Sequence, residues 1–257
     1  MQQKVKGLVV REKEQGEMDK LVYVLTDTLG MIVVRAHGVR KISSGNAKSA
    51  QTFAYSELVL DERNGFYSIR ESTLIRNFYH LREDVVHYAL ACYLCELSSF
   101  VDVGGEEGNE ILRLLLNALY ALENHISEPL VIKAGFEFRL AALIGFAPDL
   151  SECPICGKAA DEIPDRVFDL TDGYLFCASC ENPADGFTHR RSVSEPVYHA
   201  LKHILTSPLN KVYLFQISPK SLMELSEIAE LFILLRMERK IPTLDFFKKT
   251  IDLPNGE

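Results

Sequence analysis

The residues with the clearest chemical potential are four cysteines in the second half of the chain. They form two Cys-x-x-Cys pairs, Cys153 with Cys156 and Cys177 with Cys180, and 20 residues separate the pairs. Thiolate sulfur is a preferred ligand of Zn²⁺, and two such pairs at this spacing are typical of a four-cysteine zinc site. Because four thiolates complete a tetrahedral coordination shell, we expect a structural Zn²⁺ and not a catalytic one.

The segment between the two pairs predicts the small sheet that would position the sulfurs. Two short strands, residues 167–170 and 173–176, meet at Thr171-Asp172-Gly173, which is a hairpin turn signal. We therefore expect a zinc ribbon at about residues 150–190. Two alternatives are a pair of disulfides and a redox-active Cys-x-x-Cys. The first is typical of small secreted proteins and the second of a βαβ pattern, and neither context is evident here.

Other residues that could do chemistry have simpler interpretations. Cys92 and Cys95 form a third Cys-x-x-Cys, but they lie in an apolar helical segment, where a free cysteine behaves as a small hydrophobic residue. His199 and His203 are one helical turn apart, and a solvated helix face explains them better than a metal site. The sequence contains no phosphate-binding loop, nucleophile elbow or His-Glu-x-x-His motif. We therefore expect no catalytic residues and no enzymatic activity.

Composition and charge narrow the class of protein further. The chain has 257 residues, of which 47% are hydrophobic and 25% are charged, as in ordinary globular proteins. No apolar run is long enough to span a membrane, and the first residues lack the core of a secretory signal, so we expect a cytoplasmic protein. The net charge is −8, but residues 1–80 carry 12 Lys and Arg against 9 Asp and Glu. No acidic residue occurs in the 29 positions between Asp27 and Glu57.

The periodicity predicts an α+β protein with two domains. Residues 1–80 contain five strand-like segments bounded by turn signals, which predicts a five-stranded, closed β-barrel of the OB type. From residue 81 to residue 257 the period is helical, with the zinc ribbon inserted. The predicted strands cover residues 5–11, 20–26, 31–37, 53–60 and 66–70. The predicted helices cover residues 84–103, about 106–122, 127–145, 194–207 and 219–240.

The basic end of the chain is the candidate nucleic-acid interface. OB barrels bind single strands through a positive groove combined with aromatic stacking. Tyr23, Phe53, Tyr55, Phe66 and Tyr67 are available for stacking, although several of them must fill the barrel. Ordinary solvating charges remain an alternative explanation of the same pattern. The candidate DNA contacts are Lys4, Lys6, Arg11, Lys20, Arg35, His37, Arg40, Lys41 and Lys48.

Several motifs, taken together and in order, resemble the RecO family of bacterial recombination mediators. The most specific is Phe136-Glu137-Phe138-Arg139-Leu140, followed by the segment 145–150 that runs directly into Cys153-Pro154-Ile155-Cys156-Gly157. The barrel region contributes Gly7-Leu8-Val9-Val10-Arg11 and Gly38-Val39-Arg40-Lys41. The resemblance covers nearly the whole chain, and Gln15 departs from it at a position where the family usually has an aromatic residue.

The resemblance implies a DNA-binding protein of DNA repair and recombination, associated with the nucleoid. Such a protein binds single- and double-stranded DNA, anneals complementary strands, and works with RecR to help RecA replace single-strand-binding protein. Arg236, Arg239 and Lys240 would then be a docking site for the acidic, apolar C-terminal tail of single-strand-binding protein. Two alternatives from other classes are a zinc-stabilised scaffold that binds only protein and a nuclease, which would need clustered carboxylates for Mg²⁺.

Overall fold

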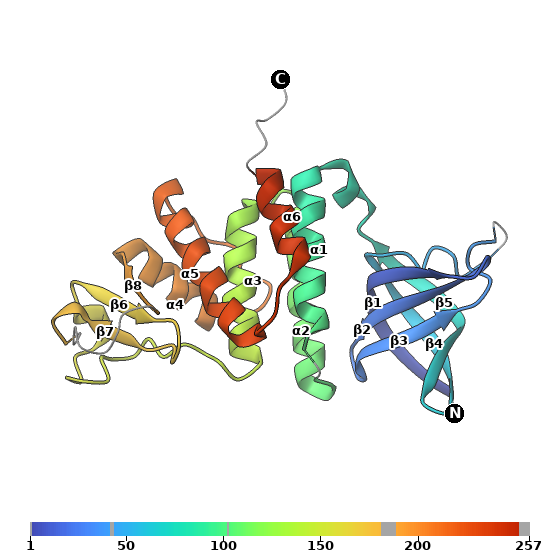
Figure 1. Ribbon diagram of the computed structural model, residues 1–257, viewed down its shortest axis with the longest axis horizontal. Helices are drawn as coiled ribbons and strands as arrows, with labels where there is room; N and C mark the ends of the chain where they lie inside the picture. Colours follow the sequence, from blue (N-terminus) through green and yellow to red (C-terminus); the bar gives the residue numbers. More distant parts are fainter. Residues whose placement is uncertain (1, 42–43, 102, 181–188, 252–257) are drawn as a thin grey trace, which may run out of the picture. The chain divides into compact units, whose positions relative to one another are not determined.

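The structure, a computed structural model, describes residues 2–41, 44–101, 103–180 and 189–251 (Figure 1). The chain groups into two compact units. The first runs to His125 and is completed by the segment from Ile241 onward, and the second covers residues 126–240. The predicted boundary between the two domains, at residue 80, falls inside the first unit. The division into domains 1–80 and 81–257 therefore stays a prediction. Part of the predicted loop 38–50, residues 42–43, lies outside the described residues.

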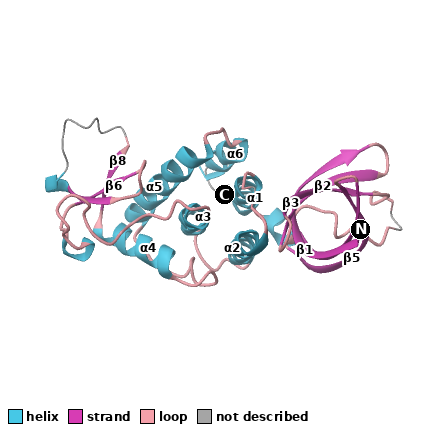
Figure 2. Cartoon of the chain, turned by 90° about the horizontal axis from the view of Figure 1, so that it is seen from below, coloured by secondary structure: helices cyan, strands magenta, loops and turns pink. Residues whose placement is uncertain are grey.

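The first unit begins with the closed barrel that the sequence predicted. Its strands are β1 (Gln2–Gln15), β2 (Asp19–Thr26), β3 (Gly30–Ala36), β4 (Ala54–Arg63) and β5 (Phe66–Asn77). They pair in the order β1-β2-β3-β5-β4, and Figure 2 shows them as a ring. All pairs are antiparallel except β3 with β5, which join in parallel through Val34 with Tyr67 and Arg35 with Ser68. Closure leaves no free sheet edge, which a five-stranded open sheet would expose.

Side chains alternate along each strand, so that every second residue points into the barrel. The outer face has two parts, one covered by helices and one uncovered. Inward residues such as Val9, Val22 and Val34 form a buried apolar core, and each buried side chain of this size contributes about 1.5–3 kcal/mol. Leu8 and Leu25 pair across β1 and β2 on the outer face, yet they too are buried. They are covered because helices of the same unit contact these strands. The described helices of this unit leave the rest of the outer face of β1, β2 and β3 uncovered.

The helices of the first unit are η1 (Tyr79–Glu83), α1 (Val85–Ser99), α2 (Gly105–Glu123) and α6 (Pro242–Ile251). Asp84 caps α1, since its carboxylate accepts hydrogen bonds from the backbone N–H groups of Val86 and His87 at 2.8 and 2.9 Å. The predicted helix 84–103 was too long, because α1 ends at Ser99; Asp102 lies outside the described residues. Helix α6, which packs against α1, was not predicted from the sequence.

The second unit combines three helices with a small sheet. The helices are α3 (Pro129–Leu143), α4 (Glu195–Thr206) and α5 (Pro219–Met237), and the strands β6 (Arg166–Asp169), β7 (Leu175–Cys177) and β8 (Arg190–Val193) pair in the order β7-β6-β8. Two short 3-10 turns are also present: η2 (Ala160–Glu162) precedes β6, and η3 (Ala178–Cys180) follows β7. The predicted ribbon hairpin is present, and β8 is a third strand that the sequence did not reveal.

A buried ionic cluster joins α3 to α5 inside the second unit. Lys133 is 1% exposed, and its ammonium nitrogen lies 3.0 Å from a Glu137 carboxylate oxygen and 3.1 Å from one of Glu230. The helix predicted over residues 127–145 starts later in the structure, after Glu128. The Ser127 hydroxyl donates to the Tyr213 carbonyl at 2.6 Å.

Across the described residues, no helix has the length and apolar character required to cross a membrane.

Two glycines with similar backbone conformations allow the packing of the barrel against α2 to be measured. Gly16 has φ +63° and open space around its missing side chain, whereas Gly30 has φ +67° and a Cβ placed there would lie 2.4 Å from the Val103 carbonyl oxygen. We expect Gly16→Ala to cost about 1–2 kcal/mol of unfolding free energy through backbone strain alone. Gly30→Ala should cost at least about 1 kcal/mol more, because Val103 must move. Urea unfolding of both variants checks this, and equal costs would show that the contact at Gly30 is not tight.

Candidate metal centre and nucleic-acid interface

The first Cys-x-x-Cys pair lies in a tight turn that closes on itself. The Gly157 N–H donates to the Cys153 carbonyl at 2.8 Å, and the Cys153 N–H donates to the Lys158 carbonyl at 2.9 Å. Gly157 has φ +70°, in the left-handed region that glycine adopts without strain. The turn therefore directs the side chains of Cys153 and Cys156 to one side, as the sequence predicted.

The second pair comes from the end of the ribbon hairpin. The Asp169 carboxylate accepts hydrogen bonds from the Thr171 and Asp172 N–H groups at 2.8 and 3.2 Å, which fixes the turn between β6 and β7. Strand β7 ends at Cys177, and η3 then brings Cys180 back toward the same point.

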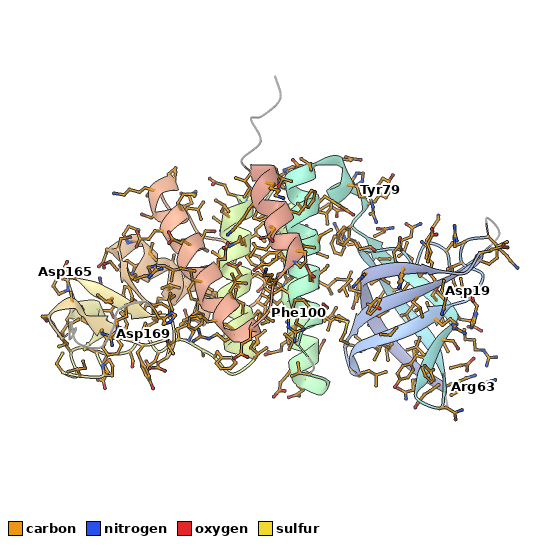
Figure 3. All side chains as sticks on the ribbon, viewed as in Figure 1. Asp19, Arg63, Tyr79, Phe100, Asp165 and Asp169 are labelled. Atoms are coloured by element: carbon orange, nitrogen blue, oxygen red, sulfur yellow. The ribbon has the colours of Figure 1, made fainter. Side chains whose placement is uncertain are left out.

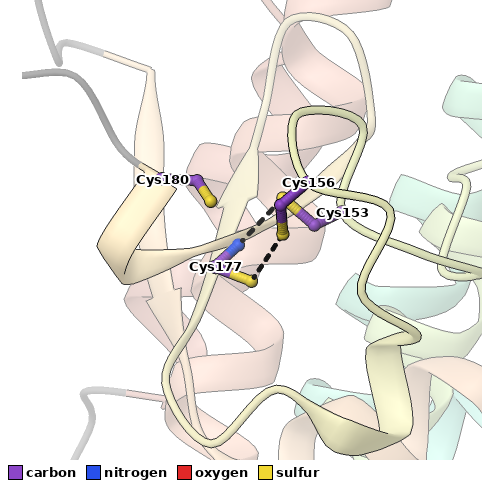
Figure 4. Close-up of side chains that lie close together, drawn as sticks. All are labelled: Cys153, Cys156, Cys177 and Cys180. Atoms are coloured by element: carbon purple, nitrogen blue, oxygen red, sulfur yellow. Dashed lines mark hydrogen bonds between the residues drawn. The ribbon is translucent and has the colours of Figure 1, made fainter.

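The four sulfur atoms converge on one location (Figure 4). All four lie within 4.8 Å of one another, and the Cys156 and Cys177 sulfurs are 3.7 Å apart. Four sulfurs at about 2.3 Å from a tetrahedral Zn²⁺ would be about 3.8 Å apart. All six cysteines of the chain are free thiols in the structure. The donor set and its spacing therefore fit a metal ion held by four thiolates.

The electrostatics of the cluster oppose ionisation of all four thiols together. Burial alone would raise the pKa of the Cys153 thiol. The backbone N–H groups of Cys177, Cys156 and Ile155 donate to its sulfur, and because their effect is larger than that of burial, the pKa falls to about 6. Burial and the neighbouring thiols raise the pKa of Cys177 to about 12. One thiolate is thus stabilised by the backbone, and further thiolates are opposed by burial and by the first. A divalent cation at the centre would remove that opposition.

The predicted DNA contacts do not form one group in the structure. Arg11 and Arg35 lie on the uncovered outer face of β1, β2 and β3, where the Arg35 side chain donates to the neutral Gln15 amide at 3.0 Å. Lys6 lies on the half of β1 that pairs with β4, and Lys41 and Lys48 lie in the connection between β3 and β4. Lys6, Lys41 and Lys48 are exposed, and no carboxylate among the described residues pairs with them.

The other four predicted contacts are engaged in ion pairs within the barrel. Arg40 also donates to the Gly16 carbonyl at 3.1 Å, so it ties the β1–β2 turn to the loop after β3. Lys20 has a side chain only 19% exposed, which makes it part of the barrel end. Their role in DNA binding stays a prediction. The pairs are Lys4 with Glu57 at 2.8 Å, Lys20 with Glu12 at 3.2 Å, His37 with Asp19 at 2.8 Å, and Arg40 with Glu14 at 3.3 Å.

Lys13 on β1 and Arg63 on β4 are further cations on the uncovered outer face of the barrel, and they were not among the predicted contacts. Lys13 follows Arg11 at the two-residue period of a strand, so this period could have revealed it. Arg63 lies at the tip of the β4–β5 hairpin and is exposed (Figure 3). Arg63 lies near β3 only because β5 pairs with β3 where the barrel closes, and the sequence does not reveal this pairing.

The comparisons with known proteins cover both halves of the chain. The family model described as Recombination protein O N terminal matches residues 1–78, and the model described as Recombination protein O C terminal matches residues 82–245. The chain belongs to the RecO family. Proteins named DNA repair protein RecO resemble it over nearly their whole length: that of Acetivibrio thermocellus is 30% identical and that of Alkaliphilus metalliredigens is 27% identical. These alignments cover 97% of both chains in the first case, and 96% of this chain and 98% of the relative in the second. Membership confirms the resemblance seen in the sequence and assigns the chain to the recombination mediators of DNA repair.

The cations proposed as a partner site in this RecO-family chain have different environments. Arg236 is half-buried, and its guanidinium lies 3.6 Å from the centre of the Phe232 ring and donates to the carbonyl groups of Leu170 and Thr171. Arg239 and Lys240 are exposed. Arg236 therefore serves the packing of the ribbon on α5, and the partner role of all three stays a prediction.

The other candidates from the sequence lie in packed or surface positions, and half-buried His203 lies 3.0 Å from the Lys211 carbonyl oxygen. Cys95 is buried and Cys92 is half-buried on α1, and burial raises the pKa of both thiols. His199 is exposed and pairs with Glu195, one turn earlier on α4, at 2.9 Å.

We expect one metal ion per chain, held by the four cysteines. Cys156 is exposed, so Cys156→Ala should disturb no apolar core and yet abolish stoichiometric metal, whereas Cys92→Ala on α1 should retain it. Structural zinc contributes about 10–16 kcal/mol of apparent binding energy in small zinc peptides, so its loss should unfold the ribbon. Elemental analysis with amide hydrogen exchange checks this: protection should fall in residues 150–180 and in β8, and persist in α3 and α5. Full metal content in Cys156→Ala would contradict the site.

Proposed function

We propose that this RecO-family protein binds single- and double-stranded DNA through the outer face of its barrel, without breaking a covalent bond. The observation that supports this most is the uncovered face of β1, β2 and β3, where Arg11, Lys13 and Arg35 are exposed. Within the described parts of the chain, none of the three pairs with a carboxylate. Phosphates bound there would release counterions, which supplies most of the affinity for any DNA sequence.

The nine residues of the predicted interface would contribute unequally. Lys6, Arg11, Arg35, Lys41 and Lys48 form no ion pair among the described residues, although the Asp19 carboxylate is near enough to Arg35 to interact with its charge. Phosphates therefore displace no ion pair at these five cations. Lys4, Lys20, His37 and Arg40 must first give up an ion pair or share it, and surface pairs of this kind are worth about 0–1 kcal/mol. We propose that the first group carries most of the binding and that the second holds the strands and turns of the barrel itself together.

We propose Zn²⁺ as the metal of the four-cysteine site, in a structural role. Four sulfur donors at near-tetrahedral spacing suit Zn²⁺, and they leave no open position for a water or a substrate. The ion would hold the ribbon hairpin and the 153–157 turn together in place of a larger apolar core.

Family membership supports the mediator activity. We propose that the protein anneals complementary strands, because a cationic face that neutralises phosphates lowers the repulsion between two strands brought to it. We further propose that it acts with RecR to help RecA replace single-strand-binding protein, and that it associates with the nucleoid through DNA. The support for these partners is the family, together with the cationic face that any of these steps requires.

A hollow on the second unit supports a dock for the C-terminal tail of single-strand-binding protein. It has a volume of about 320 Å³ and is lined by Leu231, Leu234 and Leu235 of α5, with His189 and Arg191 beside them. We propose that the apolar end of the tail fills this hollow and that the cations of residues 236–240 attract its acidic residues. Leu235→Asp should then weaken capture on an immobilised tail peptide at least about tenfold, as a lost anchor does; capture equal to wild type would reject this dock.

The cationic face predicts a specific dependence of DNA affinity on salt. Each phosphate contact contributes about 0.7 to the slope of log affinity against log salt for single strands. The triple substitution Arg11→Ala, Lys13→Ala and Arg35→Ala removes three exposed cations of this face. Together these changes should lower the slope by about 2 and weaken binding at low salt. Fluorescence anisotropy with a labelled oligonucleotide measures both quantities.

The matched control removes three exposed lysines of the second unit, Lys158, Lys211 and Lys220. It should leave the slope near that of wild type. An unchanged slope in the barrel variant would reject the proposed interface. Wild-type protein that binds no DNA at low salt would favour the scaffold alternative, and cleavage of labelled DNA with Mg²⁺ would favour the nuclease.

A further inference from the structure

The uncovered face of the barrel carries an apolar strip as well as cations. Strand register places Arg11 opposite Tyr23, and Tyr23 opposite Val33. Val34 pairs with Tyr67 at the closure of the barrel, so the residues one position earlier, Val33 and Phe66, are also neighbours. These side chains point outward, because Val34 and Tyr67 point into the barrel core. The strip therefore crosses β1, β2, β3 and β5 in one continuous row.

The strip is accessible to a ligand. Phe66 is 79% exposed, the highest value among the large apolar side chains that the structure describes, and Val33 is 46% exposed. Arg63 pairs with Phe66 across the β4–β5 hairpin and ends the row on that side. At its other end the Arg11 guanidinium lies 5.4 Å from the centre of the Tyr23 ring. An exposed aromatic strip between two arginines has the composition of a binding surface and not of a solvated one.

A second row of residues runs beside the first and is mostly polar. Lys13 pairs with Leu21, and Leu21 with Arg35, while Arg35 pairs with Ser68. Residues two positions apart on a strand are about 7 Å apart, so the cations of this row lie close beside the apolar strip. The row ends at Asp61, the partner of Ser68 on β4. One edge of the strip thus carries a cation on β1 and another on β3, with Leu21 between them on β2.

We infer that Tyr23, Val33 and Phe66 form a stacking platform for unpaired bases, so that this face prefers single-stranded DNA to duplex. The inference rests on the proposed function and specifies its substrate. A flexible single strand can place its phosphates along Lys13 and Arg35 while its bases lie on the strip, whereas a duplex hides the faces of its bases and offers phosphates only. In OB-type barrels generally, ligands lie on strands 2 and 3 between the β1–β2 and β4–β5 connections, and Phe66 directly follows the second of these.

The absence of tryptophan from the sequence makes a direct test possible. Phe66→Trp introduces a unique indole at the strip, and stacking on a base should quench its fluorescence. Ile75→Trp is the control, because Ile75 is 50% exposed on the same strand but away from the strip. We expect saturable quenching of the tryptophan at position 66 by an unstructured oligonucleotide, little quenching by the corresponding duplex, and none at position 75. Equal quenching by both forms of DNA, or none at position 66, would overturn the inference.

Removing the Phe66 ring measures how much it contributes to the affinity for single-stranded DNA. Phe66→Ala should weaken single-strand binding roughly 5- to 150-fold, the range measured for loss of one base-stacking residue, and leave duplex binding unchanged. The thermal midpoint should not fall, because Phe66 packs little against the protein. If Phe66→Ala binds single strands as wild type does, the platform is refuted while the proposed function survives. If this variant keeps its DNA affinity but loses a protein partner, Phe66 is a protein contact and the platform is likewise refuted. If no variant and no wild-type protein binds DNA at low salt, the proposed function itself fails.

Discussion

The short parallel pairing of β3 with β5 is the constraint on which the proposed interface depends. Two residue pairs, Val34 with Tyr67 and Arg35 with Ser68, close the barrel. They bring the β4–β5 hairpin, which is next to β3 only because the barrel closes, against the strand that carries Val33 and Arg35. Since Val34 and Tyr67 must enter the core, their neighbours Val33, Arg35 and Phe66 must face outward. A slip of one residue would reverse every one of these directions.

The distribution of acidic partners decides which cations remain available on the barrel. Glu12, Glu14 and Glu57 pair with Lys20, Arg40 and Lys4. These pairs lie at the barrel end, at the β1–β2 turn and toward β4, so among the described residues Arg11, Lys13 and Arg35 form no ion pair, although Asp19 interacts with the Arg35 charge. The four-cysteine cluster of the second unit has the opposite electrostatic character. Burial and mutual repulsion oppose ionisation of its thiols, and a cation at the centre would relieve both.

The sequence predicted the features that local spacing determines. Turn signals located five strands, and the two Cys-x-x-Cys pairs located the four residues that converge in the structure. Helix α6 was not predicted, because the cationic residues that end at Lys240 were interpreted as the C-terminus of the last helix. The packing of α6 on α1 joins distant parts of the sequence, so local periodicity does not reveal it. Likewise β8 was not predicted, because its partner β6 is separated from it in the sequence by the segment that contains the second cysteine pair.

Which side chains face the ligand could not be read from the sequence. A bulge between Val9 and Arg11 shifts the register of β1, and it sets which residues of the strand's second half point outward. Phe66 and Tyr67 are adjacent aromatics, and either could have filled the barrel until closure fixed Tyr67 inside. The ion pairs of Lys20 and Arg40 also depend on this three-dimensional register. Composition therefore identified the basic end of the chain, and only the fold separated its free charges from its paired ones.

If the proposed interface is correct, single-stranded DNA lies across β1, β2, β3 and β5 on the uncovered face of the barrel. Photo-crosslinking of the full chain to an oligonucleotide containing 4-thiothymidine, followed by peptide mass spectrometry, tests this placement most directly. We expect crosslinks in the peptides that contain Tyr23 and Phe66, lost in competition with unlabelled single strands. Crosslinks confined to residues 126–240 would contradict it.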